Sequence, residues 1–190
     1  MEQGKNLLGE FEGADKAHVY ATFLDRFLAV IIDMLLLGIF TIPINWYNET
    51  SVKSPVLLII VAIVSIVYKP LLEFKYGATV GKMVMKIIVV NTAFQPLDLK
   101  EAILRNIFEW GSKIYSLILG LIVFARPGFE LVRTYKEYGN FSNYDKSRTH
   151  WILVIYMVIL ITEIGLLLSD DQQRSLHDRI GGTLVIRKPD

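Results

Sequence analysis

The chain has 190 residues, 53% of them hydrophobic, and a mean hydropathy of +0.42. The apolar residues gather in long blocks, which is typical of a membrane protein and not of a soluble domain of this length. A formal net charge of +1 gives no reason to expect a nucleic-acid partner. Because the chain has no cysteine, disulfides, thiolate metal sites and cysteine catalysis are excluded.

The chain opens with a polar segment, residues 1–20, followed by two clear apolar blocks at 27–46 and 55–72. The first 25 residues lack the pattern of a cleaved signal peptide, so we expect the first block to stay in the membrane. The second block begins with Pro55, which the first turn of a helix tolerates. A helix of about 20 residues spans roughly 30 Å, the thickness of the hydrocarbon core.

Two further apolar blocks lie at 107–125 and 151–168, separated by a basic insert at 126–150. The third block carries Glu109 and Lys113, so arrangements with three and with four spans both remain open. In either arrangement most of the 20 Lys and Arg residues lie on the side of the N-terminus. The positive-inside rule therefore predicts that the N-terminus is cytoplasmic.

Two short β-like runs, IIVVN at 87–91 and TLVIR at 183–187, are expected to pair. Their pairing requires both runs on one side of the membrane, which favours four spans with both termini cytoplasmic. Between the runs and the third block, Asp98 followed by Glu101 fits a capping box at the start of a helix. The sequence thus predicts an all-α membrane protein, a four-span transmembrane helical bundle over 21–187 with a small cytoplasmic β element.

The first span contains an unusual charge. Arg26 and Asp33 are seven residues apart, which places them on one helical face about 10 Å apart along the axis. An ionised Asp at mid-span costs roughly 2.5–3.5 kcal/mol, so Asp33 should face protein or water. Three interpretations stay open: a structural polar clamp, ion or proton handling, and a position of Asp33 near the membrane interface.

The stretch from Glu73 to Lys86 contains Gly77, Gly81 and Lys82. It is not a Walker A motif, because only three residues separate the glycines and Met83 follows the lysine. We expect two flexible turns here, with Lys82 at the level of the lipid head groups.

Near the C-terminus, His177, Asp178 and Arg179 are adjacent. A His–Asp pair can shuttle protons, whereas a solvated cap is the simpler interpretation. Gly181 and Gly182 are expected to end the short helical turn before the last β-like run. The chain shows no metalloprotease spacing and no nucleophile elbow, so we expect no enzymatic activity, no metal and no cofactor.

Four motifs occur in order along the chain. They are RFLAVIID with Arg26 and Asp33; EFKYGATVGK with Glu73, Gly77, Thr79, Gly81 and Lys82; LRN with Arg105; and LHDRIGGT with His177, Asp178, Arg179, Gly182 and Thr183. Together they resemble the RDD family of bacterial integral membrane proteins over roughly residues 20–187. That family takes its name from one arginine and two aspartates, which correspond here to Arg26, Asp33 and Asp178. The resemblance implies a multi-pass protein of the bacterial plasma membrane.

Two functions follow from this resemblance. Some members have been linked to monovalent cation/proton antiport, in which Asp33 would titrate with Arg26, Arg105 and Asp178 around it. Four short spans leave little room for alternating access, so an antiporter would need to be a homo-oligomer in the lipid bilayer. The alternative is a non-catalytic scaffold or regulator that binds another membrane protein, which fits the lack of an internal repeat and the large cytoplasmic motif cluster.

Overall fold

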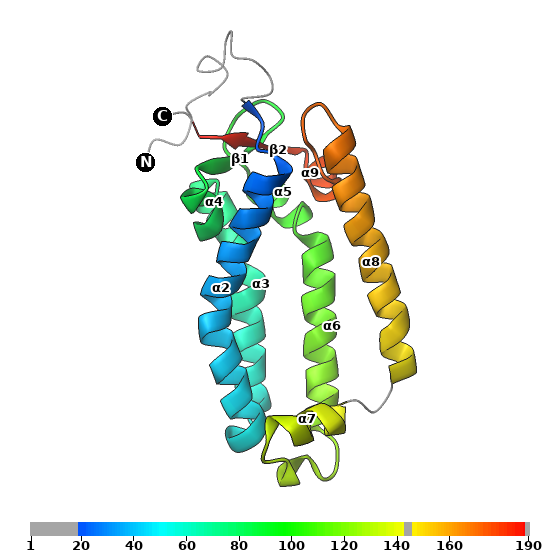
Figure 1. The fold of residues 1–190 in the computed structure, drawn as a ribbon. Helices are drawn as coiled ribbons and strands as arrows, with labels where there is room; N and C mark the ends of the chain where they lie inside the picture. The colour runs from blue at the N-terminus through cyan, green and yellow to red at the C-terminus, as the bar shows by residue number, and fades with distance from the viewer. Residues whose placement is uncertain (1–18, 143–145, 189–190) are drawn as a thin grey trace. The chain divides into compact units, whose positions relative to one another are not determined.

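The computed structural model describes residues 19–142 and 146–188, with side chains undescribed at 146–153 and 156 (Figure 1). The chain forms two compact units. Unit 1 comprises the described parts of 1–35, 68–108 and 159–190. Unit 2 comprises the described parts of 36–67 and 109–158. Each long helix is continuous in the chain but contributes residues to both units.

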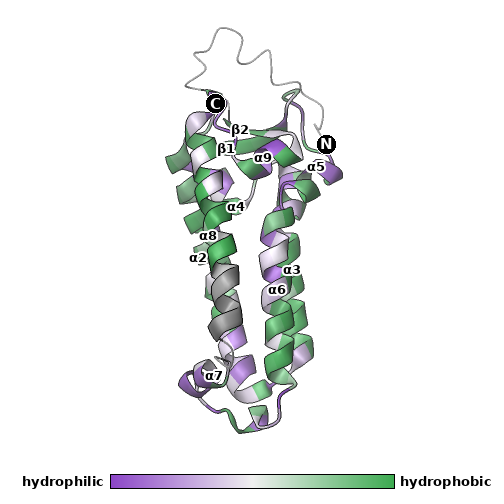
Figure 2. Cartoon of the chain, turned by 90° about the vertical axis from the view of Figure 1, so that its right-hand side faces the viewer, coloured by the Kyte–Doolittle hydropathy of each residue, from purple (hydrophilic) through white to green (hydrophobic). Residues whose placement is uncertain are grey.

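The four apolar blocks all form long helices. They are α2 (Phe23–Tyr47), which continues as a π-helical turn η2 (Asn48–Val52), α3 (Pro55–Tyr76), α6 (Ile107–Phe124) and α8 (Lys146–Ser169). The third block is one unbroken helix despite its two charges. Figure 2 shows the hydrophobic colour along α3 and the hydrophilic colour in the short helix α7.

Within the described part of the chain, three helical segments are long and apolar enough to cross a membrane: Phe23–Val52, Pro55–Tyr76 and Ile107–Phe124. In α8, the apolar stretch found among the described residues is Met157–Ser169, which is shorter than a span. The fourth block is therefore a helix, and its crossing of the membrane stays a prediction.

The small elements of unit 1 are α4 (Val80–Val84), β1 (Ile87–Asn91), α5 (Leu99–Leu104), α9 (Leu176–Gly181) and β2 (Thr183–Arg187). The two predicted β-like runs pair as antiparallel strands, from Ile87 opposite Arg187 to Asn91 opposite Thr183. Their β-branched side chains suit a pleated surface, and Ile87, Val89 and Val185 are almost fully buried. The predicted capping box at Asp98 is confirmed at the start of α5.

The insert at 126–150 is partly helical and belongs to unit 2. It contains a 3₁₀ turn, η3 (Phe129–Leu131), and α7 (Tyr135–Ser142). Phe129 is buried against Val123 and Val132, with the rings of Tyr138 and Phe141 packed around them. This small aromatic core holds α7 against the end of α6.

Candidate functional site

The centre of unit 1 is a buried carboxylate, Asp178, placed between two arginines. Arg105 donates from Nη2 to Asp178 Oδ1 at 2.8 Å, and Arg26 donates from Nη1 to Oδ2. Arg26 also donates to the carbonyl of Gln173 at 2.6 Å. Asp178 is held by α9, where it forms a capping box with Ser175. Burial alone raises the pKa of Asp178, but the charges of His177, Arg26 and Arg105 outweigh it and hold the pKa well below its usual range.

A second buried carboxylate, Glu73 near the end of α3, extends the network. Arg105 Nε lies 3.3 Å from Glu73 Oε2, and Asn106 donates to the same oxygen at 3.1 Å. Lys82, from α4, forms an ion pair with the other oxygen of Glu73. Arg105 therefore bridges the two acids, and the network ties α2, α3, α4, the residues after α5, and α9 into one cluster.

Burial and the charges of the network also shift the pKa of Lys82. The acids Asp178 and Glu73 form salt bridges with Arg26, Arg105 and Lys82, and the charge of Lys69 also acts on Glu73 and Lys82. Burial lowers the pKa of Lys82 to about 8; Glu73 opposes this shift, and the charge of Arg105 adds to it. Lys82 is 7% exposed. The side chain of Lys82 is therefore turned into the protein against Glu73 and does not face lipid, while its expected level at the head groups stays a prediction.

Asp33 has a different set of partners. Its Oδ1 accepts from the hydroxyl of Tyr68 at 2.8 Å and from the backbone N–H of Gly81 at 2.8 Å, and its Oδ2 accepts from Thr79 Oγ1 at 2.6 Å. Because Thr79 is the N-cap of α4, the carboxylate lies at the positive end of that helix. The expectation that Asp33 joins the cluster around Arg26 was wrong, because two turns of α2 separate the two side chains.

The close approach of α4 to α2 explains a motif glycine. A Cβ on Gly81 would lie 2.0 Å from the carbonyl oxygen of Ala29 and 3.0 Å from Cγ of Asp33. Only a residue without a side chain lets the backbone N–H of Gly81 reach Asp33 here.

The two carboxylate sites lie within the part of the chain that matches a known protein family. The RDD family model matches residues 20–182. The chain belongs to the RDD family. It is a membrane protein of that family, with apolar helices in contact with lipid. No curated protein and no solved structure matches the chain.

Most of the other motif residues of this RDD protein lie in the turns and contacts around the two carboxylate sites. Gly77 and Gly182 have positive φ values of 69° and 63°, which favour glycine, and Gly182 ends α9 as predicted. A Cβ on Gly181 would lie 2.8 Å from Cβ of Arg105, so this glycine lets α9 approach the arginine. Thr183 is buried beside Asp178, whereas Arg179 pairs with Asp170 away from the network.

Residues 177–179 were interpreted as a solvated cap, and this interpretation was wrong for Asp178 and His177. Asp178 is fully buried, and His177 binds Glu163 of α8, with Nδ1 and Oε2 2.6 Å apart. Glu163 is the one acid of the apolar block at 151–168, and the sequence analysis did not pair it with His177. A charge isolated within an apolar block was the available signal, since such a group needs a polar partner.

Sequence reasoning also missed Tyr68, Asn106 and Ser175, which complete the hydrogen bonding of the three acids. Ser175 stands three residues before Asp178, the spacing of a capping box, and Asn106 is the last residue of the LRN motif, so local signals existed for these two; Tyr68 has none. In the described part of the chain, no group of three or more His, Asp or Glu side chains is placed to hold a metal ion.

Proposed function

We propose that this RDD protein is a non-catalytic scaffold or regulator that binds another protein in the bacterial plasma membrane. We further propose that it crosses that membrane four times with both termini in the cytoplasm. The rival function is a monovalent cation/proton antiporter in which Asp33 exchanges a proton for an ion.

The bonding of Asp33 is the observation that supports the scaffold over the antiporter. Three donors, at 2.6 to 2.8 Å, already occupy both of its oxygens, and one of them is the backbone N–H of Gly81. Releasing that donor requires α4 to move away from α2, which it contacts through Gly81 and Ala29. Asp33 therefore acts as a fixed anchor for α4, whereas an exchanging carboxylate needs room for a proton and then for an ion.

The network around Arg105 supports the same proposal. Buried ion pairs contribute little net stability but strongly favour one geometry, since breaking a pair leaves an unpaired charge in the interior. Here they lock five segments of unit 1 into a single arrangement. A surface held rigid in advance loses less entropy when a partner binds.

Reconstitution into liposomes tests the rival directly. A pH gradient would be imposed across proteoliposomes, and sodium and potassium flux would be measured for the wild type, for Asp33→Asn and for protein-free liposomes. We expect wild-type flux equal to that of the protein-free control. If the wild type shows flux above the protein-free control and Asp33→Asn does not, antiport is established and the proposal is refuted.

Binding of a partner is tested by purification from native membranes after mild crosslinking. We expect a second membrane protein in near-stoichiometric amount, and less of it with Asp178→Asn, which disturbs the network. The matched control is Asp170→Asn, because Asp170 pairs with Arg174 and Arg179 outside the network. Recovery of this chain alone, or only as a homo-oligomer, would count against the proposal.

A further inference from the structure

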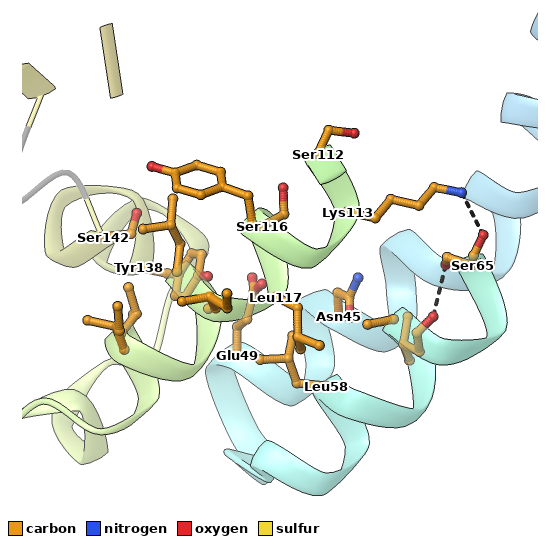
Figure 3. Close-up of a pocket in the computed structure, with 18 of the residues that line it drawn as sticks. Asn45, Glu49, Leu58, Ser65, Ser112, Lys113, Ser116, Leu117, Tyr138 and Ser142 are labelled. Carbon is orange, nitrogen blue, oxygen red and sulfur yellow. Dashed lines mark hydrogen bonds between the residues drawn. The ribbon is translucent and has the colours of Figure 1, made fainter. Parts of the chain in front are cut away.

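Outside the charged network of unit 1, other ionisable side chains have partners of their own. In a cavity of unit 2 lined by α3 and α6, Lys113 donates to the carbonyl of Ser65 at 2.6 Å and pairs with a carboxylate of its own helix at 2.8 Å (Figure 3). This lysine is therefore paired within unit 2. His177 of unit 1 differs, because its ring nitrogens lie near two carboxylates at once, those of Glu163 and Asp178.

The ring of His177 lies between acids of two different helices. Its Nδ1 is 2.6 Å from Oε2 of Glu163, on α8, and its Nε2 is 3.5 Å from Oδ1 of Asp178, at the centre of the network. The backbone N–H of His177 also donates to Oε1 of Glu163 at 3.3 Å. Both oxygens of Glu163 therefore bind one residue of α9, and that residue contacts the buried network on its other side.

This position suits only the doubly protonated ring. A neutral imidazole carries one N–H and one lone pair, whereas the imidazolium carries an N–H on both nitrogens. With a carboxylate at each nitrogen, a neutral ring must turn its lone pair toward one of the two acids. The hydroxyl of Ser175 lies 3.0 Å from Nδ1, but a hydrogen bond from it leaves the carboxylate of Glu163 facing the same nitrogen at 2.6 Å.

The charged groups that face His177 among the described residues come from α2, α8, α9 and the segment after α5. Two carboxylates attract the protonated ring, and two guanidinium groups that bind one of these carboxylates repel it; the four residues are Glu163, Asp178, Arg26 and Arg105. Neighbouring charges pair with one another instead, namely Asp170, Arg174 and Arg179. Because the guanidinium charges offset that of Asp178, the decisive partner of His177 is Glu163.

The part of α8 that belongs to unit 1 is held by few buried side chains. Between residues 159 and 169, all of which the structure describes, Leu167 is the one buried side chain, whereas Ile161 and Leu168 are 64% and 62% exposed. Apolar burial against unit 1 therefore contributes little to the position of this part of α8. The contact between Glu163 and His177 carries a correspondingly large share of the attachment to α9.

We propose that His177 is a proton-dependent latch that holds residues 159–169 of α8 against α9. The protonated ring binds Glu163 and Asp178 together. When the ring loses its proton, the contact with Glu163 weakens and this part of α8 loosens, while Arg26 and Arg105 keep Asp178 in place. The latch is therefore closed at low pH and opens as the pH rises. It requires neither a partner protein nor ion transport, so its test is independent of the proposed function.

Spin labels measure the latch directly, because the chain has no native cysteine. Labels are attached to Ile161→Cys on α8 and Ile180→Cys on α9, at side chains that are 64% and 41% exposed. Pulsed electron paramagnetic resonance of the full chain in nanodiscs then gives the distribution of distances between the labels at about pH 5 and about pH 8, the range in which histidine ordinarily changes its charge.

We expect one narrow distance at the lower pH and a second, broader population at the higher pH. The ratio of closed to open latch should fall by roughly 10- to 100-fold, the usual effect of a charge-assisted hydrogen bond on an equilibrium. The matched control pair is Val84→Cys on α4 with Ile180→Cys, whose distance should not change, because α8 takes no part in it. A distance between α8 and α9 that is the same at both pH values would overturn the proposal.

Two variants assign the pH response to the latch. His177→Gln keeps a hydrogen-bonding side chain that does not titrate, and Glu163→Gln removes the charge on α8 without touching α9, so each should abolish the response. The matched control replaces the other two histidines of the chain, His18→Gln with His150→Gln, and should keep the response in full. A response that persists in either His177→Gln or Glu163→Gln would refute the latch, and Glu163→Gln alone decides if His177→Gln fails to fold.

Discussion

Replacing Asp178 with asparagine removes the charge between two buried arginines while keeping the shape of the side chain. The side chains of Arg26 and Arg105 are 11% and 1% exposed, so neither guanidinium can recover its solvation in water. Loss of one partner from a buried ion pair costs about 3–5 kcal/mol. Asparagine still offers an oxygen that can accept the capping hydrogen bond of α9. The loss of stability therefore measures the missing charge and not a missing cap.

Thermal unfolding in detergent micelles measures this loss. At roughly 2–4 °C per kcal/mol for a chain of this size, Asp178→Asn should lower Tm by about 6–20 °C. The matched control, Asp170→Asn, should cost less than about 1 kcal/mol, because its partners Arg174 and Arg179 are 29% and 41% exposed. A loss for Asp178→Asn no larger than that of the control would refute the reasoning.

A double variant separates the charge from general disruption. In Asp178→Asn, the guanidinium groups of Arg26 and Arg105 both lose their shared carboxylate. Adding Arg26→Met removes the cation whose carboxylate is lost in Asp178→Asn, whereas Arg105 keeps its pair with Glu73, so the double variant should lose less stability than the sum of the two single variants. Additive losses would mean that Arg26 and Asp178 do not interact as the structure indicates.

Three further predictions concern the packing of α4 and the dependence of stability on pH. Gly81→Ala should destabilise unit 1 strongly, since its Cβ would lie 2.0 Å from the carbonyl of Ala29, whereas Gly111→Ala meets nothing within 4 Å and should be close to neutral in Tm. Stability should fall as the pH drops below about 4, because the lowered pKa of Asp178 means that the unfolded chain binds a proton there first; Asp178→Asn should reduce this fall in acid titrations followed by tryptophan fluorescence. Between about pH 8 and 10.5, Lys82 has lost its proton in the folded chain but keeps it in the unfolded chain, so the free energy of unfolding should rise with pH. The measurement is Tm as a function of pH for the wild type and for Lys82→Met. If Tm rises as steeply with pH in Lys82→Met as in the wild type, the lowered pKa of Lys82 is contradicted.

Several features of this RDD protein could be predicted from local patterns alone. Apolar blocks of about 20 residues predicted the long helices, and the β-branched runs predicted the strands from Ile87 and Thr183. The capping box at Asp98 and the turn at Gly182 were predicted from residues three or fewer positions apart. These features depend on backbone geometry over one or two turns, which a short stretch of sequence determines.

The partners of the charged residues were decided by tertiary structure. The sequence placed Arg26 and Asp33 on one face and suggested one constellation, but the fold separates them into two sites. Lys82 was expected at the membrane surface, and Glu163 had no predicted partner. In each ion pair that the sequence did not predict, the two partners belong to different helices. Hydrophobic periodicity and caps carry no information about which charge meets which, because that pairing depends on how the helices pack and on the solvation that each buried charge must regain.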